Sequence, residues 1–253
     1  MNIKIGNQLV SFDEILPVTK VGESGDKPKT LIFLHGWGGS KQSLRRLAEM
    51  TLPEAKKILL DLPGFGESEN PPKDWGITQY TNLIHDFLKN FGFSNVDIIG
   101  HSFGGSIALK AAASHTPHIR KIVTIAPSWI RKEIDHTKGK YSLIKPIFDK
   151  LPLLKRGVYK VFFPDSDLMR YPELQDNFKK IVNEDLTEEI RNLTTPTLII
   201  WGSEDSQTPV ENAKLLHSLL PHSRLEIIEG HKHNIPVKYP DLLERQINEF
   251  LRT

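Results

Sequence analysis

The 253-residue sequence contains no cysteine. Disulfide bonds, cysteine-ligated zinc and a thiol nucleophile are therefore excluded. Long apolar runs are also absent, because no stretch approaches the ~20 residues that a membrane-spanning helix needs, and we expect no stable membrane insertion. Residues 1–8 show no basic segment followed by an apolar one. We therefore expect no secretory signal and a cytoplasmic location.

The chain also lacks a strong excess of charge of either sign. Its 33 Lys and Arg residues stand against 31 Asp and Glu residues, which gives a formal net charge of +2. This balance gives no reason to expect nucleic acid as a partner. With 38% hydrophobic and 25% charged residues, the composition is that of a globular protein long enough for one substantial core. Nothing in it predicts an oligomeric state.

Short apolar runs alternate with helical patterns along most of the chain. Such alternation predicts an α/β fold, in which a mostly parallel central sheet carries helices on both faces. The first 25 or so residues are expected to form short strands and turns. The expected strands are 30–34, 57–60, 96–99, 119–125, 197–201 and 225–228. The expected helices are 80–91, 102–114, 210–220 and 239–251.

The alternation breaks once, between residues 128 and 193. This segment is rich in aromatic residues and shows no convincing strand. We interpret 128–193 as a helical cap over the carboxyl edge of the sheet, and 1–127 with 194–253 as the core. Residues 128–160 are mainly basic and 161–193 mainly acidic, which favours two solvated helix faces over a basic entrance. The interleaved lysine and apolar residues of 143–163 leave a membrane-surface lipase as an alternative.

A short glycine-rich run follows the expected strand 96–99. The run Gly100-His101-Ser102-Phe103-Gly104 matches the pattern Gly-x-Ser-x-Gly and opens the expected helix 102–114. A nucleophilic serine needs this strand, sharp turn and helix. Glycine flanks the serine because side chains there would collide with neighbouring backbone in a strained turn. The pattern therefore predicts Ser102 as a nucleophile.

Four further segments accompany this run in a fixed order. They are His-Gly-Trp-Gly-Gly at 35–39, Asp-Leu-Pro-Gly-Phe-Gly-Glu-Ser at 61–68, a Gly-x-x-Asp-x-x-x-Pro segment at 202–209, and Glu-Gly-His-Lys-His-Asn at 229–234. With these motifs, the chain resembles the α/β-hydrolase family from about residue 30 to residue 250. The resemblance implies a small serine hydrolase of the carboxylesterase type with a helical cap. It also implies that Asp61 fixes a tight loop.

The resemblance implies an acid and a base after Ser102, in the chain order serine, acid, histidine. Asp205 matches the family spacing of the acid, and Glu204 is its neighbouring alternative. Two histidines compete for the base. His231 directly follows a glycine, as the family histidine usually does, whereas His233 has the usual spacing to a downstream proline. We favour His233 and keep His231 as the alternative base.

An oxyanion hole is implied as well. It would use the main-chain N–H groups of Phe103 and Trp37. By the same resemblance His35 shapes the loop that carries Trp37, and His101 takes no part in the chemistry. A metal held by the two tail histidines is disfavoured because the chain has no cysteine and no His-Glu-x-x-His motif. We therefore expect no cofactor and no metal.

These residues predict acyl chemistry at Ser102. The aromatic cap favours a small-molecule substrate that is largely apolar, such as a carboxylic ester or a related acyl compound. A thioesterase or a carbon–carbon bond hydrolase with the same triad stays open as an alternative, because one fold hosts many reactions. A non-catalytic ligand sensor on the same fold is a further alternative.

Overall fold

The computed structural model describes residues 1–18, 29–114, 118–130, 170–191 and 193–253. Most of the predicted cap, residues 131–169, lies outside the described residues. The stretch 143–163, on which the membrane-surface alternative depends, lies there too. None of the helices in the described ranges is long and apolar enough to cross a bilayer.

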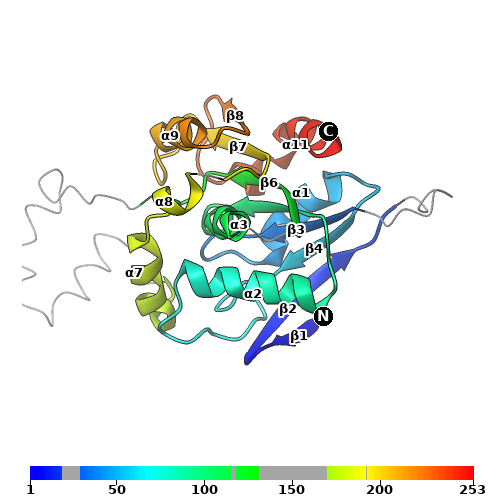
Figure 1. The fold of residues 1–253 in the computed structure, drawn as a ribbon, viewed down its shortest axis with the longest axis vertical. Helices are drawn as coiled ribbons and strands as arrows, with labels where there is room; N and C mark the ends of the chain where they lie inside the picture. Colours follow the sequence, from blue (N-terminus) through cyan, green and yellow to red (C-terminus); the bar gives the residue numbers. More distant parts are fainter. Residues whose placement is uncertain (19–28, 115–117, 131–169, 192) are drawn as a thin grey trace, which may run out of the picture.

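Eight strands form one sheet in the order β1-β2-β4-β3-β5-β6-β7-β8 (Figure 1). The strands β3 to β8 pair in parallel, and they are Thr30–Leu34, Lys56–Leu60, Val96–His101, Ile119–Ile125, Thr197–Gly202 and Ser223–Ile228. The strands β1 (Asn2–Ile5) and β2 (Gln8–Ile15) form an antiparallel hairpin at one edge. The predicted α/β fold with its mostly parallel sheet is confirmed.

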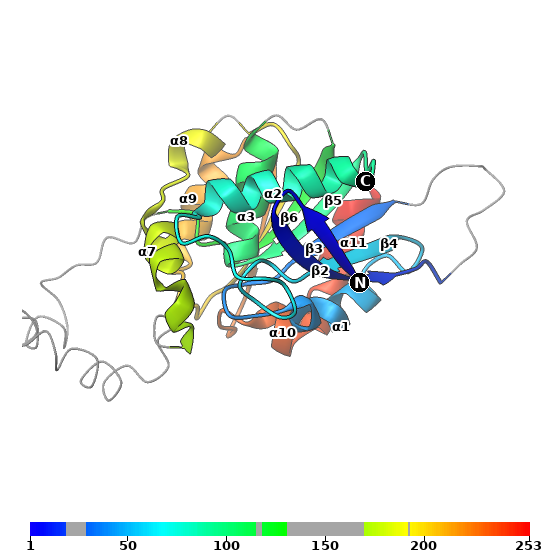
Figure 2. The same cartoon turned by 90° about the horizontal axis from the view of Figure 1, so that it is seen from below.

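Helices cover both faces of the sheet (Figure 2). On one face lie α2 (Ile77–Asn90), α3 (Phe103–Ala113) and α9 (Glu211–Leu219), whose apolar side chains share one core cluster. On the other face lie α1 (Arg45–Met50), α10 (Ile235–Lys238) and α11 (Glu244–Arg252), which pack in a second cluster. Every residue of β5 is buried, as expected for a central parallel strand covered on both sides.

The C-terminal segment differs from its prediction. Instead of one helix over 239–251, the chain forms a 3₁₀ turn, η3 (Pro240–Leu242), before α11 begins at Glu244. Pro240 lacks an N–H group and restricts the residue before it, and Tyr239 accordingly has φ −137° and ψ 50°. Proline therefore starts a new helical segment here rather than continuing one.

The described end of the 128–193 segment is helical. It contains η2 (Pro172–Leu174), α7 (Gln175–Asn183) and α8 (Thr187–Ile190), which lie together at one end of the molecule (Figure 1). Leu174, Ile181 and Ile190 are buried in the same core cluster as α2 and α3. The N–H group of Leu186 also donates to the carbonyl of Trp129 at 2.9 Å. The return limb of the segment, residues 170–191, thus packs firmly on the core, while a complete cap stays a prediction.

Candidate active site

Ser102 lies at the sharp turn between β5 and α3. Its φ of 50° and ψ of −113° are rare for a residue with a side chain and store conformational strain. The N–H group of Ser102 donates to Ile125 O at 2.9 Å, which ties the turn to β6. A Cβ atom on Gly104 would lie 2.2 Å from Leu34 O, and one on Gly100 would lie 2.4 Å from Gly104 O. Only glycine fits at these two positions, so the motif is a steric requirement of the turn.

The structure brings Asp205 and His233 together from loops after β7 and β8. Asp205 Oδ2 lies 2.7 Å from His233 Nδ1, and both residues are 6% exposed. The Thr208 hydroxyl donates to Oδ2 at 2.8 Å, and the N–H groups of Thr208 and Gln207 donate to Oδ1 at 2.9 and 2.8 Å. The carboxylate is therefore held on both oxygens.

The ionisation of Asp205 fixes the tautomer of its partner. Burial alone would raise the pKa of Asp205, but the bonds from His233 and Thr208 outweigh burial and leave this pKa below its ordinary value. An ionised carboxylate only accepts hydrogen bonds, so His233 Nδ1 must carry the proton. In the neutral ring Nε2 is therefore the nitrogen that can accept a proton from a hydroxyl group.

The competing residues lie elsewhere in the same loops. His231 Nδ1 donates to Glu229 O at 2.7 Å, and its ring stands edge-on to Tyr239 with centroids 5.0 Å apart. The side chain of Glu204 is exposed, whereas its N–H group donates to His231 O at 2.9 Å. The structure thus pairs Asp205 with His233, not with His231.

The two expected oxyanion donors lie on adjoining loops. Phe103 is the first residue of α3, so its N–H group has no acceptor inside the helix. Trp37 lies in the loop after β3, and its main-chain N–H group has no acceptor among the described residues. The rings of Trp37 and Phe103 are 5.6 Å apart, so the two loops meet. Neither N–H group therefore has a hydrogen-bond partner among the described residues.

Aromatic rings line the loop that carries Trp37. The Trp37 ring contacts Phe65 at 4.9 Å and Phe178 of α7 at 5.1 Å between centroids. The Tyr171 ring packs on Phe65 at 5.3 Å, and its hydroxyl donates to Gly38 O at 2.9 Å. The return limb of the 128–193 segment therefore supplies part of an apolar wall beside the site.

His35 links the loop that carries Trp37 to the loop at 61–68. Its Nδ1–H group donates to Gly36 O at 2.8 Å, and its Nε2 atom accepts from the N–H group of Leu62 at 3.0 Å. Burial lowers the pKa of His35 to about 4. The ring is thus neutral near pH 7 and can act as donor and acceptor at once, as both bonds require.

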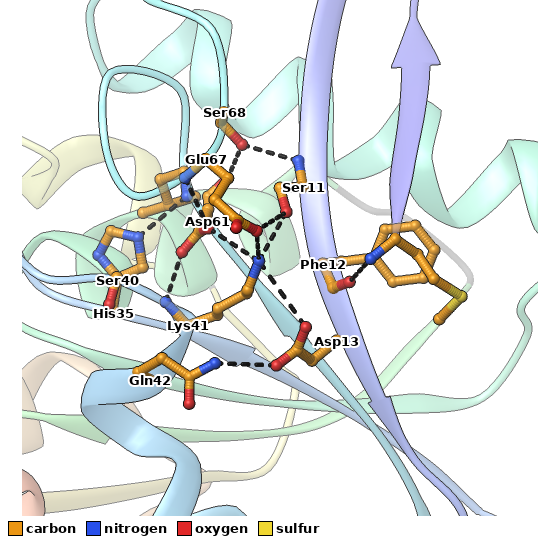
Figure 3. A network of polar contacts seen from close by, with 12 residues as sticks. Ser11, Phe12, Asp13, His35, Ser40, Lys41, Gln42, Asp61, Glu67 and Ser68 are labelled. Atoms are coloured by element: carbon orange, nitrogen blue, oxygen red, sulfur yellow. Dashed lines mark hydrogen bonds and ion pairs between the residues drawn. The ribbon is translucent and has the colours of Figure 1, made fainter.

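A buried lysine that sequence reasoning missed supports the loop at 61–68 (Figure 3). Lys41, 6% exposed, places its ammonium group 3.2 Å from Asp61 Oδ2 and donates to Ser11 Oγ at 2.7 Å. It also pairs with Glu67. The N–H groups of Lys41 and Glu67 donate to the two carboxylate oxygens of Asp61 at 2.6 and 2.9 Å. Burial alone would lower the pKa of Lys41, but Glu67 and Asp61 outweigh burial and raise it.

The neutral His35 predicts a pH dependence of stability. Its pKa is about 4 when folded and 6.5 when exposed, so between these values only the unfolded chain binds the proton. The contribution of His35 to the free energy of unfolding should therefore fall by roughly 2 kcal/mol between pH 7.5 and pH 5. Urea unfolding at both pH values checks this. His35→Gln should lose this part of the pH dependence and the exposed His217→Gln should keep it; equal dependence in the two variants would contradict the prediction.

No group of three or more His, Asp or Glu side chains in the described ranges is arranged to hold a metal ion. The candidate residues present a hydroxyl group on a strained turn, a histidine paired with a buried carboxylate, and two main-chain N–H groups.

Comparisons with known proteins agree with this architecture. A sequence profile of the alpha/beta hydrolase fold matches residues 29–141. The chain is 27% identical to the uncharacterized hydrolase YugF of Bacillus subtilis, over 88% of this chain and 90% of the relative. It is 26% identical to Lipase 1 of Psychrobacter immobilis, over 80% and 70% of the two chains. The crystal structure of a bromoperoxidase from Bacillus anthracis superposes with a TM-score of 0.76 at 22% identity and covers 100% of this chain and 99% of that one.

The eight-stranded sheet and the strained Ser102 turn define the α/β-hydrolase fold. The profile match over residues 29–141 and the solved structure agree on this fold, and relatives of the chain over most of its length are named hydrolase and lipase.

Proposed function

We propose that this chain is a serine hydrolase that cleaves a carboxylic ester, or a related acyl bond, of a small and largely apolar substrate. Ser102 is the nucleophile, His233 the base and Asp205 the acid of its triad. The observation that carries the proposal is the buried 2.7 Å contact between Asp205 and His233. It occurs in a chain whose only Gly-x-Ser-x-Gly turn holds its serine at φ 50°.

The expected mechanism follows from these groups. His233 Nε2 takes the Ser102 proton as Oγ attacks the substrate carbonyl carbon, and the N–H groups of Trp37 and Phe103 hold the oxyanion. The resulting imidazolium is stabilised by Asp205 and then protonates the leaving alcohol. Water, activated by the same imidazole, releases the acid from the acyl-enzyme.

The choice of an ester substrate rests on the surroundings of Ser102 and on one relative. The half-buried rings of Trp37 and Phe178 pack on each other beside the buried rings of Phe65 and Phe103, and this uncharged cluster next to the Ser102 turn suits an uncharged acyl group. One relative is named a lipase, and lipases cleave esters.

Labelling with a fluorophosphonate probe tests the nucleophile directly. We expect one adduct on the native protein, on the peptide that contains Ser102, because only an activated serine attacks phosphorus at a useful rate. Peptide mass spectrometry locates the adduct, and urea-unfolded protein is the control that should not react. An adduct on a different serine, or none, would refute the proposal. A parallel screen of 4-nitrophenyl esters of increasing acyl length, with a thioester and a vinylogous diketone acid, distinguishes an esterase from a thioesterase and from a carbon–carbon bond hydrolase.

A further inference from the structure

His101, directly before the nucleophile, makes a contact that the proposed chemistry does not use. It is the last residue of β5 and is 5% exposed. Its Nε2 atom lies 3.1 Å from the main-chain oxygen of His233, and the two rings are 5.0 Å apart between centroids. The residue beside Ser102 thus contacts the main chain that carries the proposed base.

The direction of this bond is fixed by its acceptor. A carbonyl oxygen cannot donate, so Nε2 of His101 must carry the proton. Burial, and then the neighbouring His233, lower the pKa of His101 to about 3, so the ring is neutral near pH 7. Its Nδ1 atom lies beside Gly36, where an added Cβ atom would come within 3.0 Å of it. The bond to His233 O therefore fixes the tautomer of the neutral ring.

Other hydrogen bonds hold the side chain of His233 and the start of its loop: the ring pairs with Asp205 at 2.7 Å, and the N–H group of Gly230 donates to Ser203 Oγ at 2.9 Å. The loop is also tied at its start to the acid loop by the bond from the N–H group of Glu204 to His231 O at 2.9 Å. Its outer side borders a cleft of about 220 Å³ lined in part by Gln207, Lys232 and Tyr239. Side-chain support for the main chain at His233 itself therefore comes from the inner side, where His101 lies.

We propose that His101 is a positioning residue for His233: its Nε2–H group fixes the main chain of the base relative to Ser102. This inference rests on the proposed function. Because His101 and Ser102 are consecutive, the bond ties nucleophile and base into one rigid unit. Proton transfer depends steeply on such alignment, and a shift of about 1 Å can lower a rate by ~100-fold. Because His101 stays neutral, it adds no positive charge beside the imidazolium that forms on His233 during turnover.

Substitutions of His101 that keep or remove the donor test this role. His101→Leu fills similar space without a donor, whereas the amide nitrogen of His101→Gln can reach the position of Nε2. We expect kcat for a 4-nitrophenyl ester to fall by about 10- to 100-fold in His101→Leu with KM changed less than about 3-fold, and to recover to within about 3-fold of the native value in His101→Gln. The acid limb of the kcat/KM profile should move to lower pH in His101→Leu, because a displaced imidazolium loses part of its contact with Asp205.

The controls separate this role from general folding. His101→Asn is polar but too short to reach His233 O, so it should resemble His101→Leu, not His101→Gln. If His101→Leu does not fold, the comparison of Asn with Gln at matched thermal stability decides the question. Native kcat and an unmoved pH profile in His101→Leu or His101→Asn, or equal loss in His101→Gln, would overturn the inference. If Ser102→Ala is as active as the native enzyme, the proposed function fails instead, whatever the His101 variants do.

Discussion

Replacing Ser102 with alanine should lower kcat for ester hydrolysis by about 10⁴- to 10⁶-fold, the loss typical of a triad that has lost its nucleophile. The hydroxyl oxygen of Ser102 forms the bond to the acyl group in the proposed acyl-enzyme, and neither His233 nor the N–H donors can replace it. Steady-state hydrolysis of the best ester in the chain-length screen measures the effect. Ser114→Ala, an exposed serine at the end of α3, is the matched control and should keep native activity.

A second substitution at the same position separates chemistry from stability. Ser102 is held at φ 50°, a conformation that costs about 1–3 kcal/mol for a residue with a side chain. Ser102→Gly should be as inactive as Ser102→Ala, yet more stable than it by about 1 kcal/mol, because glycine adopts this conformation without strain. Equal stabilities of the two variants would contradict the assignment of strain to this turn, and activity in either would contradict the nucleophile.

Replacing Lys41 with methionine should destabilise the protein by about 3–5 kcal/mol. Methionine has similar volume, but it leaves the carboxylate of Asp61, which is 1% exposed, without its cation. An unpaired buried charge is costly because the surroundings cannot solvate it. Urea unfolding at pH 7.5 measures the loss in the free energy of unfolding.

Two comparisons show that burial, not the ion pair as such, produces this effect. Arg46 pairs with Asp241 at 2.8 Å, but both side chains are more than half exposed. Arg46→Met should therefore cost less than about 1 kcal/mol. Asp61→Asn added to Lys41→Met should restore part of the lost stability, since no unpaired charge is then buried. A loss below about 1 kcal/mol in Lys41→Met would refute the role assigned to this lysine.

Much of the fold could be predicted because parallel strands are short apolar runs with clear ends. The strand β3 has the predicted bounds, 30–34. The strand β5, predicted at 96–99, continues to His101. The short helices α1 and α10 were not predicted, because four to six residues show no helical period. The break at Pro240 was missed because the apolar spacing of 239–251 continues through it.

The candidate site likewise contains residues that the sequence predicts and residues that it does not. Motif spacing favours Asp205 and His233, and these are the residues that the structure pairs. Lys41 carries no sequence signal of its function, because lysine is ordinarily a surface residue and its partner Asp61 lies 20 positions away. The bond from His101 to His233 joins residues 132 positions apart. Such contacts depend on how distant loops meet at the edge of the sheet, so no local sequence pattern predicts them.

The hydrogen bond from Tyr171 to Gly38 limits how this protein could be remodelled. An engineer who exchanged the 128–193 segment for that of another hydrolase, in order to change substrate range, would also remove the hydroxyl that holds the loop of Trp37. The contact of Phe178 with the Trp37 ring would be lost with it. A transplanted segment would need to bring its own equivalents of Tyr171 and Phe178. An exchange of this segment would therefore change the support of the Trp37 loop together with the segment itself.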